Sequence, residues 1–301
     1  MRKSVGRGVS VVIPTYNLAR FLPEAVASAR AQSWPDLEII VVDDGSTDDT
    51  PEVLERLARE GELRCIRQEN AGASAARNRG IHEARKGWVA FLDADDFWLA
   101  GKLSAQFEAL EGKPSAAFSF TDERLRFEDG TETDRASRAT DAPLLPQLLA
   151  GNIFATPTAL VRRDCFDAVG LFDARLRTGE DWDMWMRLAA HFESARVALP
   201  LTTVRVVSRA KVSLEVMERC TLLALERLFA CPHVAREWPA ITAKRGAVHA
   251  WHYSVLARSY MSGGRAADFC RLAFRAVRAH PSALRYLARA SGVSPGEVTF
   301  D

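Results

Sequence analysis

The chain has 301 residues, of which 48% are hydrophobic and 26% charged, and this composition is typical of a folded protein and excludes a disordered one. Its net charge of +1 gives no indication of nucleic-acid binding. Residues 202–301 carry 15 Lys and Arg against 7 Asp and Glu, whereas the first 201 residues carry 25 against 32. The basic residues are spaced along this last third, which favours a solvated helical surface over contact with anionic lipid or an acidic partner.

The five cysteines are widely spaced and form no C-x-x-C pair, which is typical of reduced thiols and indicates no zinc site. The first residues are basic but precede no apolar segment, so we expect no signal peptide. No run of 18 apolar residues occurs, so we expect no transmembrane helix. These features predict a cytoplasmic protein, for which peripheral contact with the inner face of the membrane stays open.

Four short apolar runs alternate with helical patterns in the first 92 residues. These runs are residues 9–13, 37–42, 63–67 and 88–92. Each of the first three is followed by residues with the helical period, so the pattern predicts three β-α units and a fourth strand. Such units form a parallel sheet with right-handed crossovers, and the sequence therefore predicts an α/β fold.

Acidic residues follow two of these expected strands, at Asp43 and Asp44 and again at Asp93 and Asp95. Because parallel strands end at one edge of a sheet, we expect these carboxylates to line one pocket, where a cation or ligand would relieve their repulsion. In extended backbone Asp93 and Asp95 point to the same side and offer hard oxygen donors for Mg²⁺ or Mn²⁺. Without such surroundings, a D-x-D sequence is more often an acidic turn with a helix cap.

Later elements are less regular. A helix is expected over residues 102–110, strands over 116–120 and 158–161, and a loop or irregular hairpin over 121–141. Short helices are expected over residues 144–149 and 163–169.

A further helix is expected over residues 179–188. Its buried stripe consists of Asp181, Met184, Trp185 and Leu188. Asp181 begins this stripe, where the helix dipole stabilises a carboxylate, and this is a sufficient structural reason for it. As the alternative, Asp181 is a general base whose pKa is tuned by neighbours such as Glu180.

The last expected strand, 202–207, leads through a basic connection into helices. These are expected over residues 214–230, 240–261, 266–279 and 282–290. The final pair resembles one tetratricopeptide-type unit, which cannot bury its own face and therefore packs on the preceding domain or on a partner. Trp251, His252 and Tyr253 are expected in a core or an interface. We predict two domains, residues 1–213 and a helical extension over residues 214–301.

Four blocks in this order and spacing resemble the family 2 glycosyltransferases. They are residues 9–17 (VSVVIPTYN), 41–48 (VVDDGSTD), 91–96 (FLDADD) and 179–188 (GEDWDMWMRL). Residues 70–80 and 169–173 fit as well, and the resemblance extends from about residue 9 to 213. It implies a GT-A fold with a parallel or mixed nucleotide-binding sheet flanked by helices, and an inverting, metal-dependent transfer from a nucleotide sugar.

The resemblance also implies the donor-binding residues. Pro14 and Tyr16 lie where the loop after the first strand touches the nucleoside. Asp44 matches the carboxylate that accepts from the base, and Arg77 lies where a basic residue approaches the nucleotide.

The same resemblance implies the reacting groups. Asp93 and Asp95 match the D-x-D pair that holds Mn²⁺ or Mg²⁺, with Asp95 favoured as the direct ligand. Asp181 matches the general base that deprotonates the acceptor hydroxyl, and Glu180 would position the acceptor.

One departure concerns the lid over the diphosphate, where many relatives have an Arg followed by a His. Arg205 is present, but no His follows it, so Arg209 or Lys211 is expected to contact the phosphates instead. A third protein ligand for the metal therefore stays open.

Together these features predict a hexosyltransferase-type enzyme that moves a sugar from a UDP-linked donor to a glycan or lipid-linked acceptor in surface polysaccharide biosynthesis. One alternative is a non-catalytic scaffold or nucleotide-sugar-binding protein, which the intact carboxylates disfavour. The other is a sugar nucleotidyltransferase, which would need a Gly-rich basic loop after the first strand, whereas residues 14–17 contain no glycine.

Overall fold

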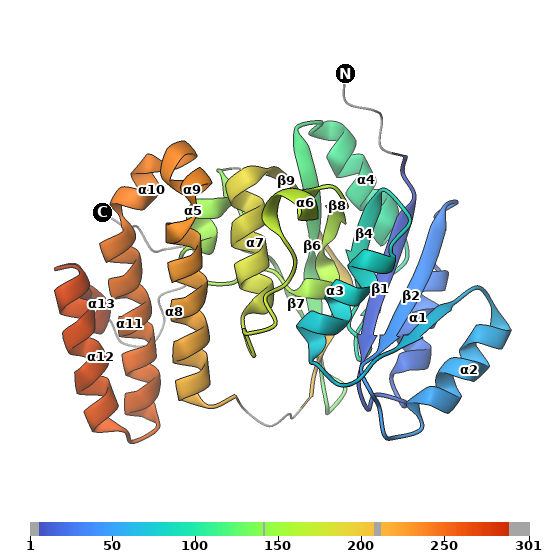
Figure 1. The fold of residues 1–301 in the computed structure, drawn as a ribbon, viewed down its shortest axis with the longest axis horizontal. Helices are drawn as coiled ribbons and strands as arrows, with labels where there is room; N and C mark the ends of the chain where they lie inside the picture. Colours follow the sequence, from blue (N-terminus) through green and yellow to red (C-terminus); the bar gives the residue numbers. More distant parts are fainter. Residues whose placement is uncertain (1–5, 141, 208–211, 289–301) are drawn as a thin grey trace. The chain divides into compact units, whose positions relative to one another are not determined.

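The computed structural model describes residues 6–140, 142–207 and 212–288 (Figure 1). The chain forms two compact units, each assembled from three segments. The first unit comprises residues 1–137, 154–174 and 192–209, and the second comprises residues 138–153, 175–191 and 210–301. Residues 138–153 and 175–191 thus group with the C-terminal helices, whereas a single division after residue 213 is predicted from the sequence.

The first unit is built on a nine-stranded sheet in the order β3-β2-β1-β4-β8-β6-β9-β5, with β7 beside β6. Its parallel strands are β1 (Val9–Thr15), β2 (Leu37–Asp43), β3 (Arg64–Arg67) and β4 (Trp88–Phe91). The other strands are β5 (Phe97–Trp98), β6 (Ala116–Phe127), β7 (Glu132–Arg135), β8 (Leu160–Arg162) and β9 (Glu193–Val206). Antiparallel pairing of β8 with β4 and β6 makes the sheet mixed, which confirms the predicted fold class.

The helices of the first unit follow the predicted β-α pattern. They are α1 (Leu22–Arg30), α2 (Thr50–Glu60), α3 (Ala73–Glu83), α4 (Lys102–Gly112) and α6 (Cys165–Val169), and one 3₁₀ turn spans Thr156–Thr158. All seven residues of β1 are buried, as expected for a central strand covered on both faces. Gly80 lets α3 lie close on β1, because a Cβ at that position would be 2.2 Å from Val12 Cγ1.

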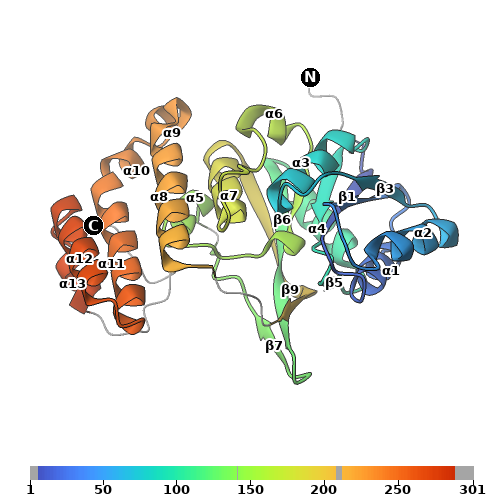
Figure 2. The same ribbon diagram turned by 60° about the horizontal axis from the view of Figure 1, so that its bottom comes forward.

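Two predictions about strands were incomplete. Residues 121–141 contain the end of β6, and its hairpin with β7 extends past the neighbouring strands (Figure 2). The charged side chains of this hairpin conceal the strand pattern, because the residues of β7 are all exposed. The last strand, β9, starts at Glu193 and not at Thr202. The missed signal is the alternation in which Ala195 and Val197 are buried between exposed neighbours.

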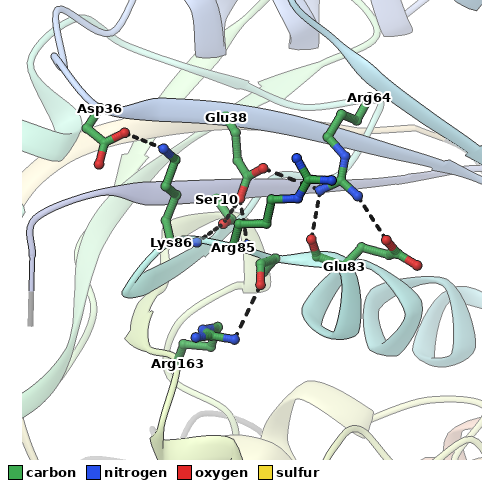
Figure 3. A network of polar contacts seen from close by, with 9 residues as sticks. Ser10, Asp36, Glu38, Arg64, Glu83, Arg85, Lys86 and Arg163 are labelled. Carbon is green, nitrogen blue, oxygen red and sulfur yellow. Dashed lines mark hydrogen bonds and ion pairs between the residues drawn. The ribbon is translucent and has the colours of Figure 1, made fainter.

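The opposite edge of the sheet, where the parallel strands begin, is joined by a polar network (Figure 3). Glu38 Oε1 accepts hydrogen bonds from Ser10 Oγ at 2.6 Å and from the Arg85 backbone N–H at 2.7 Å, and Arg64 also donates to this carboxylate. Burial alone would raise the pKa of Glu38, but these hydrogen bonds outweigh burial and hold the pKa below its usual value. The network therefore stabilises the sheet at the edge away from the carboxyl ends of the strands.

The second unit is helical. It contains α5 (Leu144–Leu148), α7 (Glu180–His191), α8 (Leu214–Ala230), α9 (Pro232–Glu237), α10 (Pro239–Ala243), α11 (Arg245–Ser262), α12 (Ala266–Ala279) and α13 (Ala283–Ala288). The bounds of α8 and α12 are those predicted, whereas the single helix expected over 240–261 is divided into α10 and α11. Trp251 and His252 are buried, which confirms that they belong to a core. None of the described helices combines the length and apolarity required to cross a membrane.

Candidate active site

The loop after β1 is fastened to the loop after β2 by Asn17. The Asn17 side-chain oxygen Oδ1 accepts the backbone N–H groups of Thr47 at 2.8 Å and Asp48 at 3.3 Å. Its own N–H donates to Ser46 Oγ at 3.0 Å. Asn17 has a positive φ of 54°, a conformation that asparagine tolerates better than most residues. Two loops at the carboxyl ends of neighbouring strands are thus held as one surface.

The two predicted nucleoside contacts on the first of these loops differ in exposure. Tyr16 is 46% exposed, so its ring is available for stacking, whereas Pro14 is buried as part of β1. Contact of either residue with a nucleoside stays a prediction.

Asp44 is 3% exposed and organises the turn before α3. Its Oδ1 accepts from Gln68 Nε2 at 2.7 Å and from the Ala71 N–H at 3.0 Å, and its Oδ2 accepts from the Gly72 N–H at 2.7 Å. A carboxylate has about four acceptor positions, so little capacity remains for a donor on a base. The predicted role of Asp44 in base recognition is untested, and the structure adds a role in shaping this loop.

Beside Asp44, two buried polar atoms lack a hydrogen bond among the described residues: Asp43 Oδ2 and Thr15 Oγ1. Asp43 is 1% exposed, and its Oδ2 lies 3.6 Å from Arg67 Nε. Asp43 and Thr15 are paired residues at the ends of the parallel strands β2 and β1. Buried polar groups are normally paired, so these atoms are candidate ligand contacts. The sequence singled out Asp43 as a pocket carboxylate but did not single out Thr15.

Arg77 of α3 contacts the end of β4. Its guanidinium donates to Asp93 Oδ1 at 2.8 Å, and its side chain is 6% exposed against 27% for Asp93. The guanidinium also lies 5.6 Å from the centre of the Phe172 ring. The structure therefore brings together two predicted site residues that are 16 positions apart in sequence.

Asp93 and Asp95 lie in a turn and not in extended backbone, because β4 ends at Phe91 and the Asp96 N–H donates to the Asp93 carbonyl at 3.0 Å. The reason given above for their common direction is therefore wrong, although both remain at the edge where β1, β2 and β4 end. Asp95 is 4% exposed. Burial, together with the charge of Asp93, raises the pKa of Asp96 well above its usual value.

Arg205 of β9 holds this turn. Its backbone N–H donates to Asp96 Oδ1 at 2.8 Å, and its guanidinium donates to the Asp95 carbonyl and to Glu24 of α1. The guanidinium also lies 4.9 Å from the centre of the Phe97 ring. Arg205 thus fixes the position of the turn from β9. The predicted phosphate contacts, Arg209 and Lys211, lie outside the described residues.

The predicted catalytic residues belong to the second unit, at the start of α7. Asp181 Oδ2 accepts from Asn152 Nδ2 at 2.8 Å, and its Oδ1 accepts from the Trp182 backbone N–H at 2.7 Å. Glu180 is the first residue of the same helix, and both side chains are partly exposed. The contact with Asn152 was not predicted, because no local pattern relates residues 152 and 181.

Two residues after Asp181 on α7, Asp183 is 1% exposed. Its Oδ2 accepts from Arg187 Nε at 2.9 Å and from Arg227 of α8 at 3.2 Å. The spacing of Asp183 and Arg187 by four residues is the sequence signal for this pair. The ion pairs fix the first turns of α7 against α8.

His252 of α11 is buried, and its Nε2 lies 2.8 Å from the Leu149 carbonyl oxygen. Because a carbonyl only accepts, Nε2 carries the proton. Burial lowers the pKa of His252 from 6.5 to about 4, so the ring stays neutral in the folded protein at neutral pH.

The free energy of unfolding is therefore expected to decrease as the pH is lowered from about 6.5 to about 4. In this range His252 is protonated in the unfolded state but stays neutral in the folded state. This single group should lower stability by roughly 2 kcal/mol between pH 7 and pH 5. Urea denaturation at both pH values checks this, with His252→Gln as the comparison. An equal pH dependence in wild type and variant would contradict the assignment.

The sequence that forms this site is similar to known proteins. The family model described as glycosyl transferase family 2 matches residues 10–170. TuaG of Bacillus subtilis, a glycosyltransferase assigned by name to teichuronic acid biosynthesis, is 35% identical over 182 residues, which cover 60% of this chain and 71% of TuaG. An uncharacterized glycosyltransferase of Rickettsia felis is 32% identical, but the match covers 66% of this chain and 33% of that longer protein.

Solved structures show the same fold. Residues 1–349 of S. aureus TarS, in complex with UDP-GlcNAc, superpose with a TM-score of 0.70 at 18% identity, covering 93% of this chain and 83% of that one. The mannosyltransferase PcManGT of Pyrobaculum calidifontis, in complex with GDP-Man and Mn²⁺, gives a TM-score of 0.55 at 20% identity, covering 98% and 81%. At these identities the likeness concerns the fold alone.

The family model covers more than half of the chain and includes the loops of Asn17 and Asp44, the Arg77–Asp93 pair and the turn at Asp95. TuaG matches along most of its own length. The chain therefore belongs to glycosyl transferase family 2.

Proposed function

We propose that this protein transfers a sugar, with inversion at the anomeric carbon, from a UDP-linked donor to a hydroxyl of a glycan or lipid-linked acceptor in surface polysaccharide biosynthesis. The main support is that the Asn17 and Asp44 loops and the Arg77–Asp93 pair all follow strands that end at one edge of the sheet. The name of TuaG supports a surface polysaccharide, and the UDP-GlcNAc complex of TarS supports a uridine donor. The proposed compartment is the cytoplasm, at the inner face of the membrane where the acceptor is lipid-linked.

In this proposal the donor binds at the ends of β1, β2 and β4. The exposed ring of Tyr16 stacks on the base. Thr15 Oγ1 and Asp43 Oδ2, which lack hydrogen bonds among the described residues, are candidate contacts for its polar groups. Arg77 approaches the diphosphate beside Asp93, and Arg209 adds positive charge.

Asp93 and Asp95 provide a donor set that suits Mg²⁺ or Mn²⁺, since both ions prefer carboxylate oxygens. Within residues 6–140, 142–207 and 212–288, no group of three or more His, Cys, Asp or Glu side chains could hold a metal ion. Two carboxylates therefore fit an ion that completes its ligands with diphosphate oxygens and water. When bound, the ion offsets the charge of the diphosphate leaving group. The Mn²⁺ complex of PcManGT supports this proposal.

Asp181 is proposed as the general base for the acceptor hydroxyl, with Glu180 positioning the acceptor. Its carboxylate is partly exposed and is oriented by Asn152 and by the Trp182 N–H, as expected for a base that meets a hydroxyl from solution. The start of a helix also favours the ionised form that a base requires.

Titration calorimetry with UDP, UDP-GlcNAc and GDP-mannose, each with Mn²⁺ or with EDTA, tests the donor assignment. We expect binding of the uridine compounds that depends on the metal. The anomeric configuration of the transferred sugar, determined by NMR, tests inversion. Absence of binding by all three compounds would favour the scaffold alternative, and retention of configuration would contradict the role of Asp181.

A further inference from the structure

We infer that the C-terminal helix α11 takes part in transfer by fixing a positioning residue, Asn152, against Asp181. This inference rests on the proposed function, because it assumes that Asp181 is the base. It concerns only residues of the second unit. It assigns to the helical extension a task that its sequence leaves open.

Asn152 holds one oxygen of the Asp181 carboxylate. Its Nδ2 donates to Asp181 Oδ2 at 2.8 Å, while the Trp182 N–H occupies Oδ1 at 2.7 Å. Two donors on opposite oxygens fix the plane of the carboxylate. Asn152 therefore fixes the direction of the Asp181 carboxylate.

Asn152 itself lies on an exposed segment that is neither helix nor strand, just after α5. The position of this segment is fixed by three buried ring N–H groups, which donate hydrogen bonds to three successive backbone carbonyl oxygens. They are Trp182 Nε1 to Leu148 at 2.7 Å, His252 Nε2 to Leu149 at 2.8 Å, and Trp251 Nε1 to Ala150 at 3.0 Å. The last carbonyls of a helix lack partners within it, and the ring N–H groups supply such partners here. The Leu148 carbonyl also accepts the Gly151 backbone N–H at 3.1 Å.

All three donor rings are buried, with exposed fractions of 3% for Trp251, 6% for Trp182 and 7% for His252. Two come from α11, and the third comes from the residue next to Asp181. The Trp182 and His252 rings also lie 5.1 Å apart. The segment that carries Asn152 and the helix that carries Asp181 are therefore aligned through one buried cluster, which α11 completes.

The test removes single donors and measures kinetics on the full-length protein. Asn152→Ala is expected to lower kcat about tenfold or more with donor KM unchanged, since small misplacement of a reacting group costs up to about 10²-fold. The acid limb of the pH–rate profile should move to higher pH, because Asp181 loses a donor to its ionised form. Asn152→Asp should move this limb further, through like-charge repulsion.

Trp251→Phe keeps the ring and removes the N–H, and it should reproduce part of this kcat loss and of the pH shift. If Trp251 acts through Asn152, the double variant is no slower than Asn152→Ala alone. Trp238→Phe is the matched control, since it removes the same group from a bond to the Ala190 carbonyl (2.9 Å) at the other end of α7. It should leave kcat and the pH profile unchanged.

Wild-type kcat and pH profile in Asn152→Ala would overturn the inference, and so would additive losses in the double variant. Should Trp251→Phe fail to fold, the exposed Asn152 variants decide the question. The variant Asp181→Asn distinguishes failure of the positioning role of Asn152 from failure of the proposed function. If it is inactive while Asn152→Ala is normal, only the positioning role fails, whereas an active Asp181→Asn overturns the base assignment and the inference with it.

Discussion

Replacement of Asp181 by asparagine is expected to lower kcat by a factor of about 10²–10⁴, the usual contribution of a general base. The amide keeps the size of the side chain but cannot take the proton of the acceptor hydroxyl. Donor affinity should stay at the wild-type value, because the proposed donor contacts of Tyr16, Arg77 and Asp93 belong to the first unit and Asp181 to the second. Initial rates and donor titrations on the same preparation measure both quantities.

Glu180→Gln is the matched control on the neighbouring residue of α7. If Glu180 positions the acceptor, its variant should raise the acceptor KM more than it lowers kcat. Turnover by Asp181→Asn at the wild-type rate would refute its role as the base. Equal kcat losses in both variants would indicate that the helix start, and not one carboxylate, is what the reaction requires.

Asp95→Asn is expected to weaken the Mn²⁺-dependent binding of UDP by at least roughly 100-fold, because an amide replaces the charged oxygen proposed as the direct ligand. Binding measured in EDTA should change little, since the nucleoside contacts are untouched. Calorimetric titration of UDP with and without Mn²⁺ separates the metal-dependent part of the affinity from the part due to the nucleoside contacts. An unaltered Mn²⁺ effect in the variant would exclude Asp95 as a ligand.

Asp96→Asn provides a control one residue away. Asp96 is also 4% exposed, but its Oδ1 accepts the Arg205 N–H at 2.8 Å, and an asparagine retains that acceptor. We therefore expect near wild-type UDP binding with Mn²⁺ from this variant. If both substitutions abolished the Mn²⁺ effect, the loss would be due to a disturbed turn and not to a missing ligand.

The sheet was predictable where burial dominates. The runs that become β1, β2 and β4 are mostly apolar, because most residues of these strands are buried. Their parallel order then places Asp44 and Asp93 at one edge of the sheet.

What the sequence did not reveal depends on contacts between distant residues. The amide of Asn17 serves a loop 30 residues away, and Asn152 reaches Asp181 across 29 residues. Neither contact is indicated by a periodic pattern or a motif in the sequence. The prediction that Asp93 and Asp95 lie in extended backbone was wrong for a local reason. The backbone hydrogen bond from the Asp96 N–H to the Asp93 carbonyl forms a turn there. The roles of the individual site residues stay predictions.

The contact between Gly80 and Val12 has a consequence for engineering a different donor preference. Randomised libraries over the loops of Tyr16 and Asp44 should leave position 80 as glycine, because any side chain there would meet Val12 at 2.2 Å and displace α3. Arg77 lies one turn earlier on that helix, so such a displacement would move the guanidinium away from Asp93. A substitution at position 80 would thus be scored as a change in donor specificity when its real effect is to shift α3. A library that keeps Gly80 avoids such false positives.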